Sequence, residues 1–318
     1  MSRVRTTAIL GVTVSAVVGM VGAAVMVTSQ ATADGAATGE RPAPVDLAVV
    51  NGRVLLLEDG RLRVQIPRGV TRGLRVFAAA GRGGPPVEAM AGRGSVAAVA
   101  QRGQLKVVAV RDLEVLGHAR LFPAAALKVA VALDAVWAIR LFGDTATRYD
   151  WVSGARRSLH LPPRTVALSA SGRTVWVIGG TSPNGWLVAI DAVRDRVVFT
   201  ARLPGLPIGV SAAGPTAAVL LAGGRTVVAT RTSGRFGVRT GPRGPRMTDI
   251  VALSSRQLAL ASRSGLHVGV WSLRGAATAV CDLAQPPRGL VWSGRSLLGA
   301  YGVPAVVGPV GGCTRVRP

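Results

Sequence analysis

The clearest hydrophobic pattern in the chain lies between Thr165 and Val210, where short apolar runs alternate with turns. The runs cover residues 165–168, 173–178, 186–190 and 197–203. Because β-branched residues favour strands and Gly accepts positive φ in the turns between them, this stretch predicts a four-stranded antiparallel sheet. The second run is apolar on both faces, which is typical of a strand packed between neighbouring sheets.

The turn between the first two runs recurs along the chain. Equivalent turns stand at Gly52, Gly94, Asp134, Gly172, Gly214, Ser255 and Gly294. Their spacing of about 40 residues is that of four-stranded propeller blades, whereas a β-sandwich has turns without this longer period. We therefore expect an all-β fold, a seven-bladed β-propeller of four-stranded antiparallel blades, with residues 45–318 as the propeller domain and the blades running from Val45 to Val316.

The unit at 165–210 resembles the YVTN-type β-propeller repeat, which is WD-repeat-like. The matching residues are Val166, Ala167, Ser169, Gly172, Arg173, Val175, Val177, Val188, Ile190, Asp191, Val197 and Val198. The match is good over this repeat and weaker over the others, and the Tyr-Val-Thr-Asn signature is replaced by Trp176-Val177-Ile178-Gly179. The resemblance implies the propeller architecture.

The N-terminus is predicted to be an export segment. Arg3 and Arg5 precede an uncharged run from Ala8 to Val27, and Ala31-Thr32-Ala33 offers small residues at a cleavage site. Residues 1–33 are therefore a signal peptide or, because the run is long enough to span a bilayer, an uncleaved transmembrane anchor. Both alternatives place the body outside the cytoplasm, in the cell envelope or the extracellular space. Residues 34–44 are predicted to be a linker.

The net charge of +23 comes almost entirely from arginine. Four arginines, Arg235, Arg239, Arg243 and Arg246, fall in a stretch rich in Gly and Pro. We interpret them as a candidate anion-binding site for envelope polymers or lipid headgroups. The alternative is a solvated outer face whose arginine content reflects codon usage.

The residues that usually carry catalysis are sparse. Three single histidines and a few scattered acids show no metal-ligand spacing, so we expect no catalytic residue, no metal site and no cofactor. Asp150 and Asp191 end equivalent strands of successive units, which favours turn capping over catalysis. Trp186 follows the longest clear loop and is the candidate aromatic of a ligand face.

Cys281 and Cys313 are the two cysteines. In an exported chain an even number of cysteines favours a disulfide, and the alternative is two free buried thiols. Both lie in or near the predicted fourth strands of the sixth and seventh blades. The expected bridge would tie the last blade to the one before it.

These observations favour an exported, non-catalytic binding module for a protein or an anionic envelope polymer. We expect a monomer that meets a membrane only through residues 1–33, if these stay attached. The alternative is a propeller-type enzyme, a dehydrogenase subunit or lactonase-like protein, which would need acids, histidines or a metal at the central channel. The basic charge permits nucleic-acid binding, but export and the absence of interleaved basic and aromatic residues argue against it.

Overall fold

The repeated runs of the sequence become sheets whose consecutive strands pair antiparallel. The computed structural model describes residues 45–58, 60–65, 71–77, 88–122, 125–244, 247–261, 266–275, 277–285, 287–301, 305–311 and 313–315. They all belong to one compact unit. The predicted export segment, the linker and Arg246 lie outside these residues. No helix of the described part is long and apolar enough to cross a membrane.

Blades 1 to 5 are four-stranded sheets. They comprise β1 (Asp46–Val50), β2 (Arg53–Glu58), β3 (Arg61–Gln65) and β4 (Thr71–Arg75); β5 (Glu88–Arg93), β6 (Val96–Gln101), β7 (Gln104–Ala109) and β8 (Val115–Arg120); β9 (Leu127–Ala132), β10 (Ala135–Arg140), β11 (Thr145–Tyr149) and β12 (Arg156–His160); β13 (Thr165–Ser171), β14 (Thr174–Gly180), β15 (Gly185–Asp191) and β16 (Arg196–Leu203); and β17 (Pro207–Ala213), β18 (Thr216–Leu221), β19 (Arg225–Thr232) and β20 (Arg235–Arg243).

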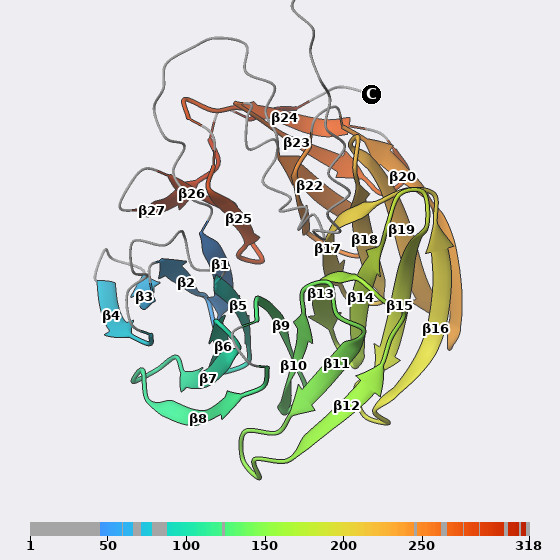
Figure 1. Cartoon of the computed structure of the whole chain (residues 1–318). Coiled ribbons are helices and arrows are strands. Elements are labelled where there is room, and N and C mark those ends of the chain that lie inside the picture. The colour runs from blue at the N-terminus through green and yellow to red at the C-terminus, as the bar shows by residue number, and fades with distance from the viewer. Residues whose placement is uncertain are drawn as a thin grey trace, which may run out of the picture. The chain divides into compact units, whose positions relative to one another are not determined.

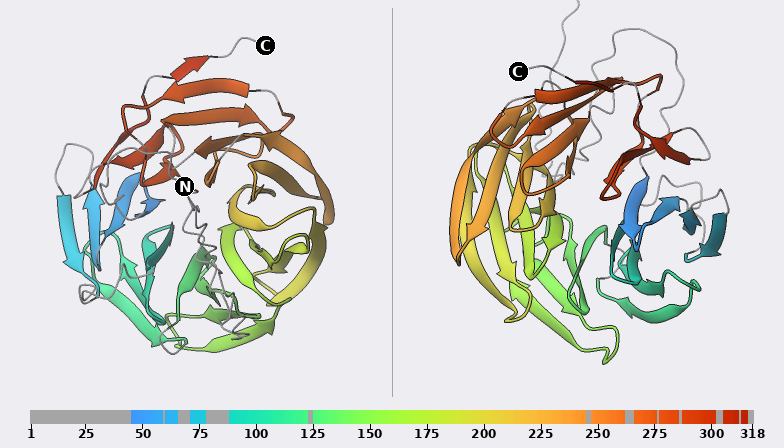
Figure 2. Two further views of the ribbon diagram at one scale, coloured as in Figure 1. Left: turned by 45° about the horizontal axis from the view of Figure 1, so that its top comes forward. Right: turned by 180° about the vertical axis from the view of Figure 1, so that it is seen from behind.

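Blades 6 and 7 complete the ring that Figures 1 and 2 show. Blade 6 contains β21 (Asp249–Ala252), β22 (Gln257–Ala261), β23 (His267–Ser272) and β24 (Ala277–Asp282), and blade 7 contains β25 (Gly289–Trp292), β26 (Leu297–Tyr301) and β27 (Val306–Pro309). The prediction of a seven-bladed, all-β propeller is confirmed.

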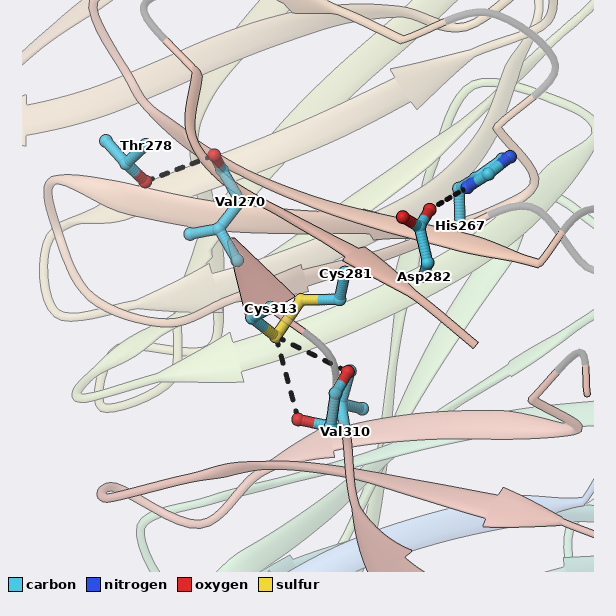
Figure 3. Close-up of a disulfide and its surroundings, with 8 residues drawn as sticks. His267, Val270, Thr278, Cys281, Asp282, Val310 and Cys313 are labelled. Carbon is cyan, nitrogen blue, oxygen red and sulfur yellow. Dashed lines mark hydrogen bonds and ion pairs between the residues drawn. A yellow bond between two sulfur atoms is a disulfide. The ribbon is translucent and has the colours of Figure 1, made fainter. Parts of the chain in front are cut away.

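The C-terminal strand departs from the expected order. β28 (Cys313–Arg315) pairs with β24, so blade 6 has five strands and blade 7 has three. Cys313 was expected at a fourth strand of blade 7, and this placement is wrong. In the observed register Cys313 stands opposite Cys281, and the two sulfur atoms lie at disulfide distance (Figure 3). The covalent partner on β24 accounts for the move to blade 6.

The core lies between blades. On β14, Val175 and Val177 pack in one cluster with Trp137 of blade 3. Trp176 packs on the other side, in a cluster with Val219 of blade 5. Both faces of an inner strand are thus buried, as the apolar run predicted, and each blade needs its two neighbours to exclude water.

Blade 7 meets blade 1 without a shared strand among the described residues. β25 lies beside β1 (Figure 1), and the Val45 N–H donates to the Arg288 carbonyl oxygen at 3.2 Å. Arg288 Nη1 lies 2.7 Å from Glu58 Oε1, and the Ala305 N–H donates to Glu58 Oε2 at 3.2 Å. Arg63 also pairs with this carboxylate. One partly buried acid therefore joins the first and last blades.

Candidate functional site

The arginines that the sequence grouped together are spread along β20. Arg235 and Arg243 are its first and last residues, so they stand about 26 Å apart by the rise of an extended strand. Arg239, between them, donates from Nη1 to the Leu273 carbonyl oxygen of blade 6 at 2.5 Å. Neighbours in the sequence are thus separated in space, because an extended strand does not gather its residues at one point.

Trp186 is largely buried, with 8% of its surface exposed. Its Nε1 donates to the Pro163 carbonyl oxygen at 2.9 Å, and the ring packs in the core between blades 3 and 4. It borders a shallow depression of about 340 Å³ with Arg164, Thr181 and Asn184. Its polar atom is already paired, so the side chain contributes mainly an apolar edge to this depression.

Asp150 and Asp191 cap turns, as predicted. Asp150 Oδ1 accepts the N–H groups of Val152 and Ser153, and Asp191 Oδ1 accepts those of Val193 and Arg194. The Ser153 N–H is the main cause of the lowered pKa of Asp150. Burial alone would raise the pKa of Asp191, but the two N–H groups and nearby arginines outweigh it, so this pKa is also lowered. Both carboxylates are therefore kept ionised for a structural task.

The histidines stand singly or beside one acid. His267 Nδ1 lies 2.6 Å from Asp282 Oδ1 (Figure 3), and His160 Nδ1 lies 3.8 Å from Asp144 Oδ2; both pairs are exposed. Across the part of the chain that the structure describes, no three His, Cys, Asp or Glu side chains gather closely enough to hold a metal ion.

A second set of arginines comes together when the ring closes. Five of the seven turns that join the two innermost strands of a blade carry an arginine at or beside the turn: Arg53, Arg93, Arg173, Arg256 and Arg295. We call this set the arginine collar. Its signal was present in the sequence, because in four of these turns the arginine adjoins the recurring glycine at position 52, 94, 172 or 294.

The turns that carry the collar lie on one face of the ring, nearest its axis, because the innermost strands line the axis of a propeller. The Arg53 side chain extends outward from its turn and donates from Nη1 to the Val110 carbonyl oxygen, at the outer turn of blade 2, at 3.0 Å. Arg93 reaches past blade 3 and donates from Nη1 to the Gly172 carbonyl oxygen at 2.6 Å. Turns that belong to blades 2 and 4 therefore converge within the reach of one side chain. Arg173, Arg256 and Arg295 are exposed, and Arg53 and Arg93 are half-buried.

Positive charge on the face that carries the arginine collar is concentrated at the inner turns. In the inner turns, all of which the structure describes, Asp134 is the single acid. The described outer turns are mixed, with Arg111, Arg194 and Arg274 beside Asp112, Glu114, Asp150 and Asp195. Asp195 is itself paired with Arg148 and Arg157. The field of the face is therefore positive at the channel mouth and balanced toward the rim.

Comparisons with known proteins bear on the fold. No family model matches the sequence, and no curated protein matches it. The structure is similar to the Swd1 β-propeller domain of Myceliophteria thermophila, with a TM-score of 0.66 and 12% identity over 83% of this chain and 94% of that one. It is also similar to hydrazine synthase of Kuenenia stuttgartiensis, with a TM-score of 0.67 and 12% identity over 89% and 99% of the two chains.

The WD40 repeats of RRP9 are a further neighbour, with a TM-score of 0.62 and 15% identity over 83% of this chain and 92% of that one. These identities are low, and the neighbours include WD40 repeats and a synthase by name, so the likeness concerns architecture. The chain is a seven-bladed β-propeller with WD40-like structural neighbours.

Proposed function

We propose that this propeller is an exported, non-catalytic binding module that holds an anionic polymer of the cell envelope at the arginine collar. The observation that carries the proposal is the placement of five arginines on or beside the inner turns of one face, with a single acid among those turns. Guanidinium groups offer planar forks of donors that match phosphate and carboxylate groups.

The charge distribution favours a narrow polyanion over a flat anionic membrane. Asp112 and Glu114 are exposed in one outer turn of the same face, between β7 and β8. A membrane surface laid across that face would bring these acids against like charge, at a cost in free energy. A thread-like polymer that enters at the channel mouth meets the collar alone. Polymer phosphate and polymer carboxylate share the chemistry that the collar recognises.

Export and the family relation are part of the proposal. The sequence of residues 1–33 supports removal of a signal peptide after Ala33. The match to the YVTN-type repeat at residues 165–210 supports descent from such repeats. N-terminal sequencing of the protein recovered from outside the cytoplasm should begin at Asp34. A chain that begins at Met1 or Ser2 would leave the anchor alternative in place of cleavage.

The binding test compares the two arginine sets directly. Labelled polyphosphate and poly-glutamate are titrated with the wild-type protein, with a collar variant carrying Arg173→Ala, Arg256→Ala and Arg295→Ala, and with a β20 variant carrying Arg235→Ala, Arg239→Ala and Arg243→Ala. Three partly exposed charge contacts at about 0.5–1 kcal/mol each predict a roughly 10- to 100-fold weaker affinity for the collar variant. The β20 variant, which loses the same charge, should bind nearly as the wild type does.

Salt titration and vesicle binding serve as further tests of the polymer proposal. Affinity should fall as salt rises, because exposed charges are screened over a Debye length of about 8 Å at physiological ionic strength. Loss of binding in the β20 variant alone would move the site to the outer strand. Equal losses of affinity in both variants would show that binding depends on net charge and not on the position of the arginines. Binding to vesicles of anionic phospholipid without binding to either polymer would identify a membrane surface and overturn the polymer proposal.

A further inference from the structure

A second candidate site lies beside Trp186, on the face of the ring opposite the arginine collar. Successive turns of an antiparallel sheet stand at alternate ends of its strands, and the collar belongs to the turns between first and second strands. The loop at residues 181–184 joins β14 to β15, and the crossing at residues 161–164 joins β12 to β13, so both lie on the other face. They form the shallow depression of about 340 Å³ that Trp186 borders, which we call the Trp186 depression.

The backbone of blade 4 is shaped to form this depression. Gly179 packs against the Trp186 ring, and a Cβ at this position would collide with that ring and with the Arg164 carbonyl oxygen. Gly180 has a φ of 107°, and its N–H donates to the Arg164 carbonyl oxygen at 2.9 Å. Two glycines therefore allow the crossing and the indole ring to lie against the end of β14.

Arg164 holds a strained backbone conformation. Its φ is 64°, in the left-handed region, and among the described residues of the crossings between blades it alone has a positive φ. Phe142, whose N–H donates to the carbonyl oxygen of Thr165 at 2.7 Å, has a φ of 60° and is half exposed. Bulky side chains in this region are strained, and such strain is concentrated at functional sites. The strained arginine at the depression therefore points to a role in binding.

The polar side chains at the rim are free to bind a ligand. Arg164 and Asn184 are exposed and Thr181 is half-buried; among the described residues, none of these three side chains has a hydrogen-bond or ion-pair partner. The apolar part of the lining consists of Pro163 and the edge of Trp186, whose Nε1 is already bonded to the Pro163 carbonyl oxygen. No acid is found among the described lining residues, so the guanidinium of Arg164 favours an anionic group.

We propose that the Trp186 depression binds the C-terminal residue of a peptide that ends in an apolar side chain. The planar guanidinium of Arg164 matches the two oxygens of the terminal carboxylate. Thr181 and Asn184 bond to the last peptide group, and the terminal side chain lies against Pro163 and Trp186. The carboxylate and the side chain of a C-terminal residue leave the same Cα atom. Both therefore fit a depression whose volume is at the lower end of the range for small-ligand sites, about 300–1,000 Å³.

The geometry disfavours two other occupants. Trp186 presents only an edge, with 8% of its surface exposed, so it offers no flat ring on which a sugar could stack. A long polyanion would meet one arginine here and finds five at the collar. Phe142, half exposed beside the crossing, provides apolar surface for the residues that precede the end of the peptide. The depression is therefore a site of its own, beyond the polymer site of the opposite face.

Nuclear magnetic resonance of the isotope-labelled protein tests the proposal at the Trp186 indole N–H, whose signal the Trp186→Phe variant assigns. The probes are the peptide acetyl-Ala-Ala-Leu with a free carboxylate and the same peptide as its C-terminal amide. The free acid should shift the Trp186 signal with a dissociation constant of about 1 mM or lower, the affinity of a small ligand held by a few contacts. The amide should bind roughly 10-fold more weakly or worse, because it lacks the charge that Arg164 recognises.

Two variants test Arg164 itself. Arg164→Gln loses the charge and should weaken binding of the free acid roughly 10-fold or more. Arg164→Gly should also lose binding, yet unfold at the same or a higher urea concentration than the wild type, because glycine adopts a positive φ without strain. Arg196→Gln is the matched control: it removes an exposed arginine from the opposite end of blade 4 and should bind as the wild type does.

The proposal is overturned if the free acid leaves the Trp186 signal unshifted, or if the acid and the amide bind equally well. Undiminished binding by Arg164→Gln would remove the arginine from the site, and equal losses in Arg164→Gln and Arg196→Gln would show an effect of net charge. Loss of peptide binding in the collar variant of the polymer test would place the peptide on the opposite face. If acetyl-Leu-Asp-Ala amide binds as tightly as the free acid, the ligand is an acidic side chain and not a chain end.

Discussion

Blade 4 and blade 7 show how differently the same repeat can be built. In blade 4 the strands contain seven, seven, seven and eight residues, and β14 and β15 are almost wholly buried. In blade 7 the three strands contain four, five and four residues. A long, apolar repeat specifies its own sheet, whereas a short one takes more of its stability from the neighbouring blades.

The cores of the two blades differ in the same way. Blade 4 shares a cluster of large side chains with each neighbour, including Trp137 on one side and Trp176 on the other. The cluster between blades 7 and 1 is small and consists of Val45, Leu56, Ala300 and Ala305, with Leu47 and Val307 packed against it. Polar contacts of Glu58 therefore carry a larger share of the joint between the last and first blades.

The largest expected effect comes from emptying the core of blade 4. Leu187 is fully buried on β15, whereas Leu297 on β26 of blade 7 is 8% exposed. We expect Leu187→Ala to lower the free energy of unfolding by about 4 kcal/mol and Leu297→Ala by about 2 kcal/mol, because the cavity costs more where the surroundings cannot collapse. Urea unfolding followed by circular dichroism measures both, and equal losses would contradict the contrast between the blades.

This contrast also explains what the sequence could predict. The period of the turns, the two apolar faces of β14 and the caps at Asp150 and Asp191 are local signals, and all three are present in the structure. The sheet that takes β28 is a nonlocal choice, made by pairing across to Cys281. A three-residue strand carries too little pattern to reveal its partner.

The two sets of arginines in the candidate site show the same difference between local and nonlocal signals. Arg235, Arg239 and Arg243 looked like a cluster because they are close in sequence, but a strand separates them. The collar arginines are about 40 or 80 residues apart in sequence, and the closed ring places the turns that carry them on one face. Comparing equivalent positions of all seven repeats, instead of reading one stretch, is what brings them together.

The next largest effect concerns the C-terminal strand. Replacing exposed Cys313 by Ala removes the bridge to buried Cys281 and leaves the core of blade 6 in place. We expect the free energy of unfolding to fall by about 3 kcal/mol, because the unfolded chain regains the freedom of the loop. Unfolding under non-reducing conditions measures the loss.

Dithiothreitol provides the control for this variant. It should lower the stability of the wild type by a similar amount and leave Cys313→Ala unchanged. Free thiols in the denatured, unreduced wild type would show that the bridge does not form in the isolated protein.

A smaller effect is expected at the junction of blades 1 and 7. Glu58→Ala removes the carboxylate that faces Arg63, Arg288 and the Ala305 N–H. Hydrogen bonds to a charged group of this kind contribute about 2 kcal/mol. Glu114→Ala, at an exposed outer turn, is the matched control and should change stability by less than about 0.5 kcal/mol. If the two variants unfold at the same urea concentration, Glu58 does not hold the junction.

The smallest effect is the acid sensitivity of the hairpin between β15 and β16 in blade 4. Blade 7 has no equivalent hairpin among the described residues, because its third strand ends at Pro309 and no fourth strand pairs with it. The pKa of Asp191 is lowered in the folded protein, so its ionised form adds stability above the unfolded value of about 3.9. That stability is lost as the pH falls through the folded pKa.

Asp191→Asn keeps an acceptor oxygen but no charge, and we expect it to cost about 1 kcal/mol near neutral pH. The difference from the wild type should shrink below about pH 4, where the wild-type carboxylate takes up a proton. Stability curves from pH 3 to 7 measure this, and a difference that stays constant over that range would show that the charge of Asp191 contributes nothing to the cap.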